Sequence, residues 1–195
     1  MGDPKFSRRT YDRPKHPWEA ARMDEEAKLL AKYGLKNKRE LWKAQSILRG
    51  FRRQARDLAA RLRAGEQQAQ RESEGLLGRL ARLALLGTGS PTLDDVLALT
   101  TDDLLVRRLQ WIVFSRGLAP TVGGARQLIV HGHIAVGDHR VTRPGYLVLA
   151  SEEGQILYSP GSGLNDDAHP IRVAMREKAV ARPEETAPAE EPVGG

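Results

Sequence analysis

The stretch RRLQWIVFSRGLAPTVGGARQLIVHGHIAVGDHRVTRPGYLV, residues 107–148, decides the fold. Its pattern predicts a helix, a turn and a second helix, followed by short antiparallel strands. Leu105, Leu109 and Ile112 have helical spacing, so they are expected to line one buried stripe of the first helix. Gly117 is a natural end for that helix, because glycine tolerates the left-handed backbone of a C-cap.

The second helix is predicted to begin after Thr121, a favourable N-cap residue, and to end at Gly132. Beyond it the period of the apolar residues changes to two. Ile134 and Val136 are therefore expected to point to one side of a strand and Ala135 to the other. The Gly-Asp pair that follows is typical of a tight turn between two strands.

Basic side chains dominate the polar positions of this module. Residues 105–150 contain six Arg and one acid, Asp138, so their net charge is +5 before any histidine is protonated. A compact module with one cationic face is typical of RNA binding. The residues expected to contact RNA here are Arg107, Arg108, Arg126, Gln127, His131, His133, Arg140 and Arg143.

The module resembles the RNA-binding domain of the small-subunit ribosomal protein four family. The resemblance rests on ARQLI at residues 125–129, on GHIAV at residues 132–136, and on residues 141–148 with Pro144 and Tyr146. Because the same module occurs in other RNA-handling proteins, it implies RNA binding without deciding which protein carries it.

The charge of the whole chain is divided into blocks. The 195 residues carry 31 Lys and Arg against 25 Asp and Glu, a net charge of +6. By segment, the net charge is +10 for residues 1–63, −4 for 64–104, +5 for 105–150 and −5 for 151–195. Two basic blocks separated by an acidic one indicate two contact surfaces on a polyanion.

Arginine and cysteine usage narrows the function class. Of the basic residues 23 are Arg, whose planar guanidinium group suits phosphate, although genomic base composition explains an Arg excess equally well. The chain has no cysteine, which excludes disulfides and thiolate metal sites and fits a reducing compartment. Without an apolar run long enough for a membrane span or a signal peptide, the protein is expected to be cytoplasmic.

Residues 1–17 predict an extended basic arm. Proline, charge and aromatic rings occur there in no regular order, so the arm is expected to be disordered or to be ordered by a partner. Cations interleaved with rings suit threading along RNA, and a frayed terminus is the alternative. The arm residues expected to contact RNA are Lys5, Arg8, Arg9 and Arg13.

Residues 38–63 predict the longest helix, with a capping box formed by Asn37 and Glu40. Apolar residues from Leu41 to Leu62 recur at spacings of three and four, which predicts one buried stripe. The other faces hold nine cations and two anions, a bias that favours RNA contact over a solvated face. The residues expected to contact RNA are Lys38, Arg39, Lys43, Arg49, Arg52, Arg53 and Arg56.

Two further helices are predicted beside the long one. The first runs from residue 18 to about Tyr33, with Met23, Ala27 and Leu30 as its inner stripe. The second covers residues 66–86 and is nearly uncharged along one side, so it is expected to pack against the basic helix. A short coiled coil is the less favoured interpretation of the long stripe.

No catalytic, metal or cofactor site is indicated. His131 and His133 form an H-x-H pair near His139, but a metal needs further ligands, so contact with RNA or simple surface exposure is favoured. The Gly-rich run at residues 87–91 lacks the Lys and the preceding strand of a phosphate-binding loop. The paired Asp residues at 94–95 and 102–103 are typical of helix starts.

Segments outside the module extend the resemblance to the archaeal and eukaryotic branch of the same ribosomal family. They are MGDPK at residues 1–5, HPW at 16–18, YGLKNKRELW at 33–42 and TLDDVL at 92–97. The resemblance covers about residues 1–172. Gly123 and Gly124 depart from the polar helix formers usual in the family, and the acidic tail lies outside the family pattern.

The resemblance implies a structural, non-enzymatic protein of the small ribosomal subunit. In that family the protein binds small-subunit ribosomal RNA at a multi-helix junction of the 5′ domain, nucleates assembly, and lies near the messenger entry channel beside proteins three and five. One alternative is an accessory RNA-binding subunit of an RNA-modification or quality-control system. A helical adaptor with an acidic protein partner is another.

The predicted fold class is α+β: a helical N-terminal domain with an inserted helix-turn-helix plus a small antiparallel β module. The segments expected are a basic arm (1–17), a helical RNA-binding domain (18–104), the αα-β module (105–150), a final strand and loop (151–172) and a disordered acidic tail (173–195).

Overall fold

The computed structural model describes residues 9–87, 89–166, 169–170 and 172–173. Most of this part of the chain is helical, and one small antiparallel sheet completes it, which confirms the predicted α+β class. The helices are α1 Ala20–Tyr33, α2 Lys38–Arg63, α3 Gln67–Arg82, α4 Leu93–Ala98, α5 Thr101–Val106, α6 Leu109–Ser115, α7 Val122–Val130, α8 Ala150–Glu153 and the 3-10 helix η1 Gly163–Asn165. The strands are β1 Ile134–Val136, β2 His139–Arg140 and β3 Ile156–Tyr158.

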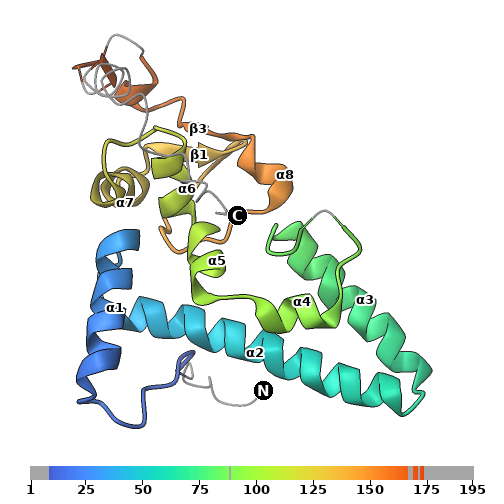
Figure 1. Ribbon diagram of the computed structural model, residues 1–195. Helices are drawn as coiled ribbons and strands as arrows, with labels where there is room; N and C mark the ends of the chain where they lie inside the picture. Colours follow the sequence, from blue (N-terminus) through green and yellow to red (C-terminus); the bar gives the residue numbers. More distant parts are fainter. Residues whose placement is uncertain (1–8, 88, 167–168, 171, 174–195) are drawn as a thin grey trace, which may run out of the picture.

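Helix α2 forms the base of the molecule (Figure 1), and it contacts α1, α3, α4 and α5. The stripe predicted from the sequence is buried: Leu41 and Ala55 are fully shielded, and Leu48 and Leu58 nearly so. Burial of each leucine stabilises the fold by about 2 kcal/mol before the entropy cost of ordering is counted. The buried stripe is divided between two cores: Leu41 and Ala44 pack with residues of α1 and α5, and Leu48, Ala55 and Leu58 pack with residues of α3 and α4.

The capping box predicted at the start of α2 forms only in part. The Asn37 side chain accepts a hydrogen bond from the Glu40 backbone N–H at 3.2 Å, as expected. The Glu40 carboxylate does not return to Asn37, because Arg108 and Arg126 bind it instead. By contrast, Thr92 and Thr100 form complete boxes at the starts of α4 and α5.

The inner face of α1 differs from the predicted stripe. Ala27 is exposed, whereas Glu26 and Tyr33 are buried. Burial of Glu26 is tolerated because its carboxylate accepts hydrogen bonds from Arg22 at 2.6 Å and from the Trp42 indole at 3.1 Å. Apolar periodicity could not identify this face, since a compensated acid occupies its centre.

The module contains its own core, built from α6, α7 and the sheet. The strand order is β2-β1-β3, and both pairs are antiparallel. Val136 lies opposite His139, so β1 and β2 are joined by the predicted two-residue turn, in which Gly137 has φ 58°. Strand β3 pairs with β1, so residues 156–158 belong to the sheet of the module, although the predicted module ended at residue 150.

Ala135 is buried, although the alternation of β1 suggested that it would face the exposed side. Arg140 and Leu157 lie directly opposite it on the two neighbouring strands. Residues directly opposite one another share a face of the sheet, so these two long side chains flank the small alanine on both sides.

Two short segments also differ from the prediction. The helix expected to pass through residue 107 is divided into α5 and α6, yet Leu105, Leu109 and Ile112 are all buried as expected. Residues 150–153 form α8, at the start of the segment that was predicted to be a final strand and loop. In the described residues, no helix combines the length and the apolar character that a membrane span requires.

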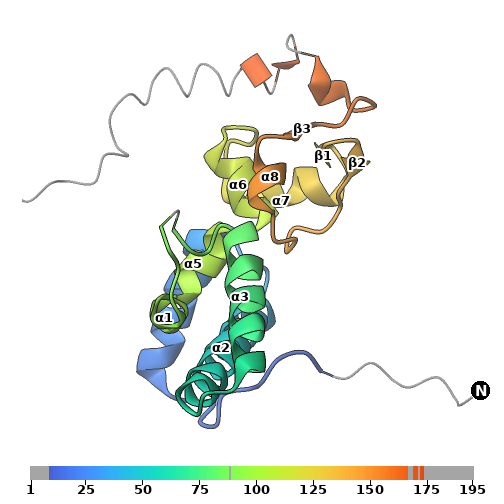
Figure 2. The same ribbon diagram turned by 90° about the vertical axis from the view of Figure 1, so that its right-hand side faces the viewer.

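The helical part and the module lie in contact around α5 (Figures 1 and 2). A joint cluster of buried residues contains Tyr33 of α1, Leu41 of α2 and Leu105 of α5, with Trp111 of α6 packed against it. Helix α8 contacts α3 at a second place. These contacts fix the module at one angle to α2.

Candidate nucleic-acid interface

A groove of about 610 Å³ separates the first half of α2 from the module. We call it the interdomain groove. Its α2 wall includes Lys43 and Ile47, and its module wall includes Arg126 and residues 143–147. The groove therefore combines side chains from both of the basic blocks in the sequence.

Three charged side chains form the floor of the groove, and we call them the Glu40 cluster: Glu40, Arg108 and Arg126. Arg126 Nη2 donates to Glu40 Oε1 at 2.6 Å, and Arg108 Nη2 donates to Glu40 Oε2 at 2.8 Å. The side chain of Arg108 is only 8% exposed. Burial alone would raise the pKa of Glu40, but the hydrogen bonds from Arg126 and Arg108 outweigh that effect and lower the pKa.

Gln110 supports the Glu40 cluster from α6. It is 1% exposed, and its amide nitrogen donates to the carbonyl of Gly34 at 2.9 Å and to that of Val122 at 3.0 Å. Its carbonyl oxygen accepts from Arg126 at 3.3 Å. One side chain thus connects the end of α1, the start of α7 and the ion cluster.

The rim of the groove carries cations that have no carboxylate partner among the described residues. Lys43 on α2 and Arg143 in the loop before Tyr146 are both exposed. Unpaired ammonium and guanidinium groups on two walls of one groove suit the phosphates of a nucleic acid.

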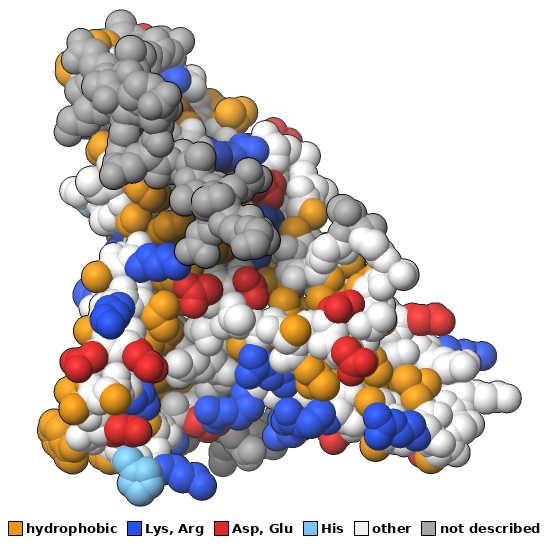
Figure 3. All heavy atoms as spheres, in the orientation of Figure 1, with side chains coloured by type: hydrophobic (Ala, Val, Ile, Leu, Met, Phe, Trp, Pro, Cys, Tyr) orange, Lys and Arg blue, Asp and Glu red, His pale blue; other side chains and the backbone are white. Residues whose placement is uncertain are grey.

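The outer face of α2 continues this positive surface. Arg53 and Arg56 are exposed, and in the described part of the chain neither forms an ion pair. Figure 3 shows Lys and Arg side chains gathered over α2 along the lower edge of the molecule. Arg39, also exposed on α2, adds to this face near its start.

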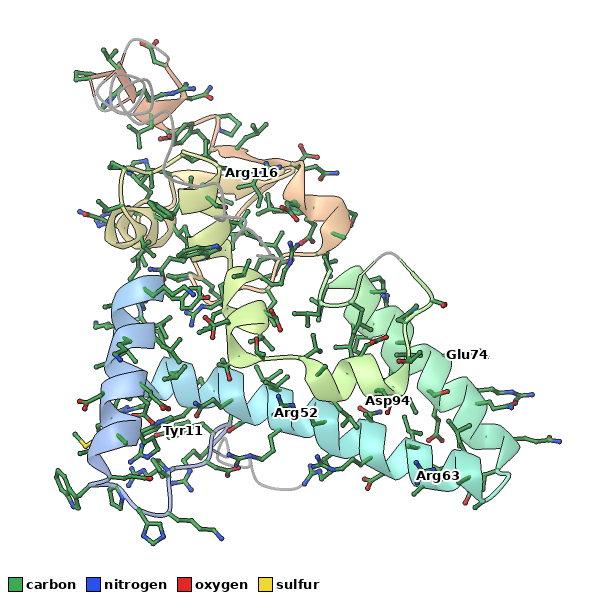
Figure 4. All side chains as sticks on the ribbon, in the orientation of Figure 1. Tyr11, Arg52, Arg63, Glu74, Asp94 and Arg116 are labelled. Atoms are coloured by element: carbon green, nitrogen blue, oxygen red, sulfur yellow. The ribbon has the colours of Figure 1, made fainter. Side chains whose placement is uncertain are left out.

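Three of the arginines predicted to contact RNA are used inside the protein. Arg107 is 9% exposed; its Nη1 pairs with Glu153 at 2.8 Å and its Nη2 donates to the Val148 carbonyl at 3.2 Å. Arg108 belongs to the Glu40 cluster. Arg52, labelled in Figure 4, donates to the carbonyl of Leu99. These side chains hold elements together; Arg107 and Arg108 are buried, whereas Arg52 is partly exposed.

The arm residues fall into two groups. Lys5 and Arg8 lie outside the described residues. Arg9 stacks over the ring of Tyr11 at 5.5 Å, and that ring lies 6.1 Å from the ring of Trp42 on α2. The described end of the arm thus contacts α2, and Asp12 pairs with Arg49 at 2.9 Å where both are exposed. Lys38 pairs with the buried Glu26 at 3.1 Å.

The polar residues of the module gather at a second place, around the turn between α7 and β1. The rings of His131 and His133 are stacked 6.4 Å apart, and His133 Nδ1 lies 2.8 Å from the Ser162 hydroxyl. Gln127 lines the same hollow of about 410 Å³. In the described ranges, no group of three or more His, Cys, Asp or Glu side chains is placed to hold a metal ion.

Arg140 lies beside this histidine pair. A Cβ built on Gly132, whose φ is 77°, would come within 2.9 Å of Arg140 Nε, so the guanidinium chain covers the backbone there. The structure therefore divides the predicted module residues between the groove (Arg126, Arg143), the α7–β1 turn (Gln127, His131, His133, Arg140) and the interior (Arg107, Arg108).

Sequence reasoning missed Glu40 as the meeting point of the two halves. Its position three residues after an N-cap suggested a purely local role. The only other signal was Gln110, a polar residue inside the apolar run LQWIVF, which indicates a buried amide that needs partners.

A groove with unpaired cations on both walls is typical of a surface that binds a polyanion. Comparisons with known proteins agree. The family model "S4 domain" matches residues 107–153, and the model "Ribosomal protein S4/S9 N-terminal domain" matches residues 5–106.

Three relatives named "Small ribosomal subunit protein uS4" are similar over nearly the whole chain. The one from Thermoplasma acidophilum is 52% identical over 175 residues, 90% of this chain and 87% of the relative. The one from Thermoplasma volcanium is 51% identical and covers 92% and 89%. The one from Picrophilus torridus is 51% identical and covers 90% and 95%. The chain belongs to the ribosomal protein S4 family, as the resemblance implied.

Proposed function

We propose that the chain is a structural constituent of the small ribosomal subunit and binds small-subunit ribosomal RNA directly. The observation that carries this proposal is the interdomain groove, in which Lys43 and Arg143 present cations from two walls held at a fixed angle. RNA helices that converge at a junction bring phosphates together at a fixed angle, so a rigid two-walled cationic groove suits them.

The role is non-catalytic. The relatives are named as ribosomal subunit proteins rather than enzymes, which is consistent with the sequence-based prediction. Cytoplasmic localisation follows from membership of a small subunit that works there.

The finer assignment comes from the family resemblance of the sequence. The RNA target is a multi-helix junction of the 5′ domain, the protein nucleates subunit assembly, and it lies near the messenger entry channel beside ribosomal proteins three and five. The rigid angle between α2 and the module supports the junction part of this assignment, because a flexible linkage would not select RNA helices by their relative orientation.

Binding to an RNA transcript of the 5′-domain junction tests the proposal. We expect tight binding that weakens steeply with salt, and the variant Lys43→Ala/Arg143→Ala should reduce the slope of log K against log salt by about 2, since each phosphate contact contributes about 0.9. The matched control is Arg71→Ala/Arg79→Ala, two exposed arginines on α3.

Two outcomes would contradict the proposal. If the wild-type chain binds the junction no more tightly than an unrelated RNA hairpin, the target is wrong. If the groove variant and the α3 control have the same slope, the groove is not the contact surface. Co-sedimentation of the protein with small subunits in a gradient tests the ribosomal assignment separately.

A further inference from the structure

A third hollow, of about 470 Å³, lies where the arm meets the first turns of α1 and α2. It is lined by the rings of Tyr11, Trp18 and Trp42 and by the cations Arg13 and Arg39, and we call it the Trp18 pocket. Its volume falls within the roughly 300–1,000 Å³ typical of ligand sites. Figure 4 shows Tyr11 near the lower part of α1, where the chain lies against α2.

The indole of Trp18 is the most unusual side chain of this pocket. It is 87% exposed, whereas Trp42 and Trp111 are half-buried. A large flat apolar ring facing solvent is costly, and it contributes nothing to the core of the helical domain. Such a ring provides a stacking surface for a planar ligand.

The charges around the pocket are unbalanced. Its one carboxylate, Glu26, is committed to Arg22 at 2.6 Å, Lys38 at 3.1 Å and the Trp42 indole at 3.1 Å. Burial raises the pKa of Glu26, but these hydrogen bonds outweigh that effect and lower it, so the carboxylate stays ionised and paired. Within the described residues, the exposed Arg13 and Arg39 form no ion pair.

A stacking ring beside two unpaired guanidinium groups matches the two parts of a nucleotide. A base presents a planar face, and its phosphate carries the opposite charge to Arg13 and Arg39. Trp and Arg are also enriched at protein interfaces. The RNA ligand is favoured because the pocket offers no free carboxylate to a basic peptide, and because the unpaired positive charge continues along α2 through Arg53 and Arg56.

We propose that the Trp18 pocket binds one unstacked nucleotide of a single-stranded RNA segment, with the base on the Trp18 indole and the phosphate on Arg13 and Arg39. This site rests on the proposed RNA-binding function and adds a second kind of contact to it. The interdomain groove reads the backbone of a folded junction, whereas this pocket recognises a base that has left its helix.

The test measures the affinity of the full chain for a labelled oligoadenylate of about ten nucleotides and for an abasic strand of the same length and charge. We expect Trp18→Ala to weaken oligoadenylate binding about tenfold and Trp18→Phe to keep most of the affinity, because phenylalanine still stacks. Neither variant should change binding to the abasic strand.

The control is Leu157→Ala, which removes another highly exposed apolar side chain, 63% exposed, on β3. Since Trp18 is exposed, its loss should leave the circular dichroism spectrum unchanged.

The outcomes separate this proposal from the one before. If wild-type protein and Trp18→Ala bind oligoadenylate equally while the junction transcript still binds, the pocket proposal fails alone. If oligoadenylate binding depends on Trp18 but the junction transcript is not bound, the pocket stands and the junction assignment fails. If Trp18→Ala leaves oligoadenylate affinity intact but abolishes association with small subunits, a protein docks on the pocket and the nucleotide proposal is overturned.

Discussion

Two pairs of arginines have opposite roles: Arg53 and Arg56 on α2, and Arg107 and Arg108 just before α6. Arg53 and Arg56 on α2 face solvent with no partner among the described residues. Arg107 and Arg108 before α6 are buried, and each pairs with a carboxylate. Residue type alone did not distinguish the two pairs. The comparison teaches that in this chain only part of the positive charge is available to a ligand, and the rest sets the shape of the surface that presents it.

The largest expected effect comes from removing the acid that the buried arginines share. Glu40→Gln leaves Arg108 and Arg126 close together with no negative charge between them, and we expect the free energy of unfolding to fall by about 3 kcal/mol. Urea denaturation measures it. The control is Glu25→Gln, an exposed acid on α1 with no ion pair in the described part of the chain. Equal stabilities of the two variants would show that the Glu40 cluster does not join the halves.

The next largest effect is expected when the exposed arginines Arg53 and Arg56 are removed. Arg53→Ala/Arg56→Ala should leave the unfolding midpoint unchanged and reduce the salt slope of junction binding by about 2, because two phosphate contacts are lost. Arg71→Ala/Arg79→Ala on α3 is the reference. An altered unfolding midpoint with an unaltered salt slope would mean that Arg53 and Arg56 contribute to stability and do not contact RNA.

The decrease in the free energy of unfolding at acidic pH should depend on Glu40 and Glu26. The folded-state pKa of both is lowered, so the stability they contribute is fully present above their ordinary carboxyl pKa and is lost as the pH falls through the lowered values. We expect the wild-type chain to lose stability in that acidic range and Glu40→Gln to show a shallower decline. Parallel pH profiles for the two proteins would contradict this.

The smallest effect is expected at the pair that the arm forms with α2. Asp12 and Arg49 are both exposed, with side chains 67% and 63% accessible, so solvent screens their attraction. Asp12→Asn should therefore change the free energy of unfolding by less than about 0.5 kcal/mol. A thermal unfolding scan suffices, and a loss comparable with that of Glu40→Gln would mean that the arm is a structural element of the helical domain.

The sequence predicted those parts of the fold that depend on neighbouring residues. The stripe of α2, the Thr92 and Thr100 caps and the turn at Gly137 each follow from local spacing or backbone preference. The lining of the interdomain groove was predicted only in part. The partners of Glu40 lie 68 and 86 residues away, and no periodicity within α2 reports on them.

The same limit explains the errors on α1 and β1. Glu26 is buried at the centre of the α1 face because Trp42 and Lys38 of α2 compensate it. Ala135 lies between Arg140 and Leu157, which are opposite it on two other strands. In each case a contact between distant segments determined the burial of the residue, and the pattern along one segment did not predict it. The net charge of whole blocks of sequence, by contrast, correctly indicated RNA as the class of ligand.

The amide of Gln110 has a consequence for the order of events during synthesis. Domains generally fold from the N-terminal end as the chain emerges. Gly34 and Glu40 are made early, but their partners on α6 and α7 follow only after another 70 residues or more. Until translation passes Arg126, the Glu40 carboxylate lacks its bond to α7, and Gln110 lacks its bonds to Val122 and Arg126. A nascent chain halted before Arg126 would present the α2 wall of the groove without the module wall opposite it.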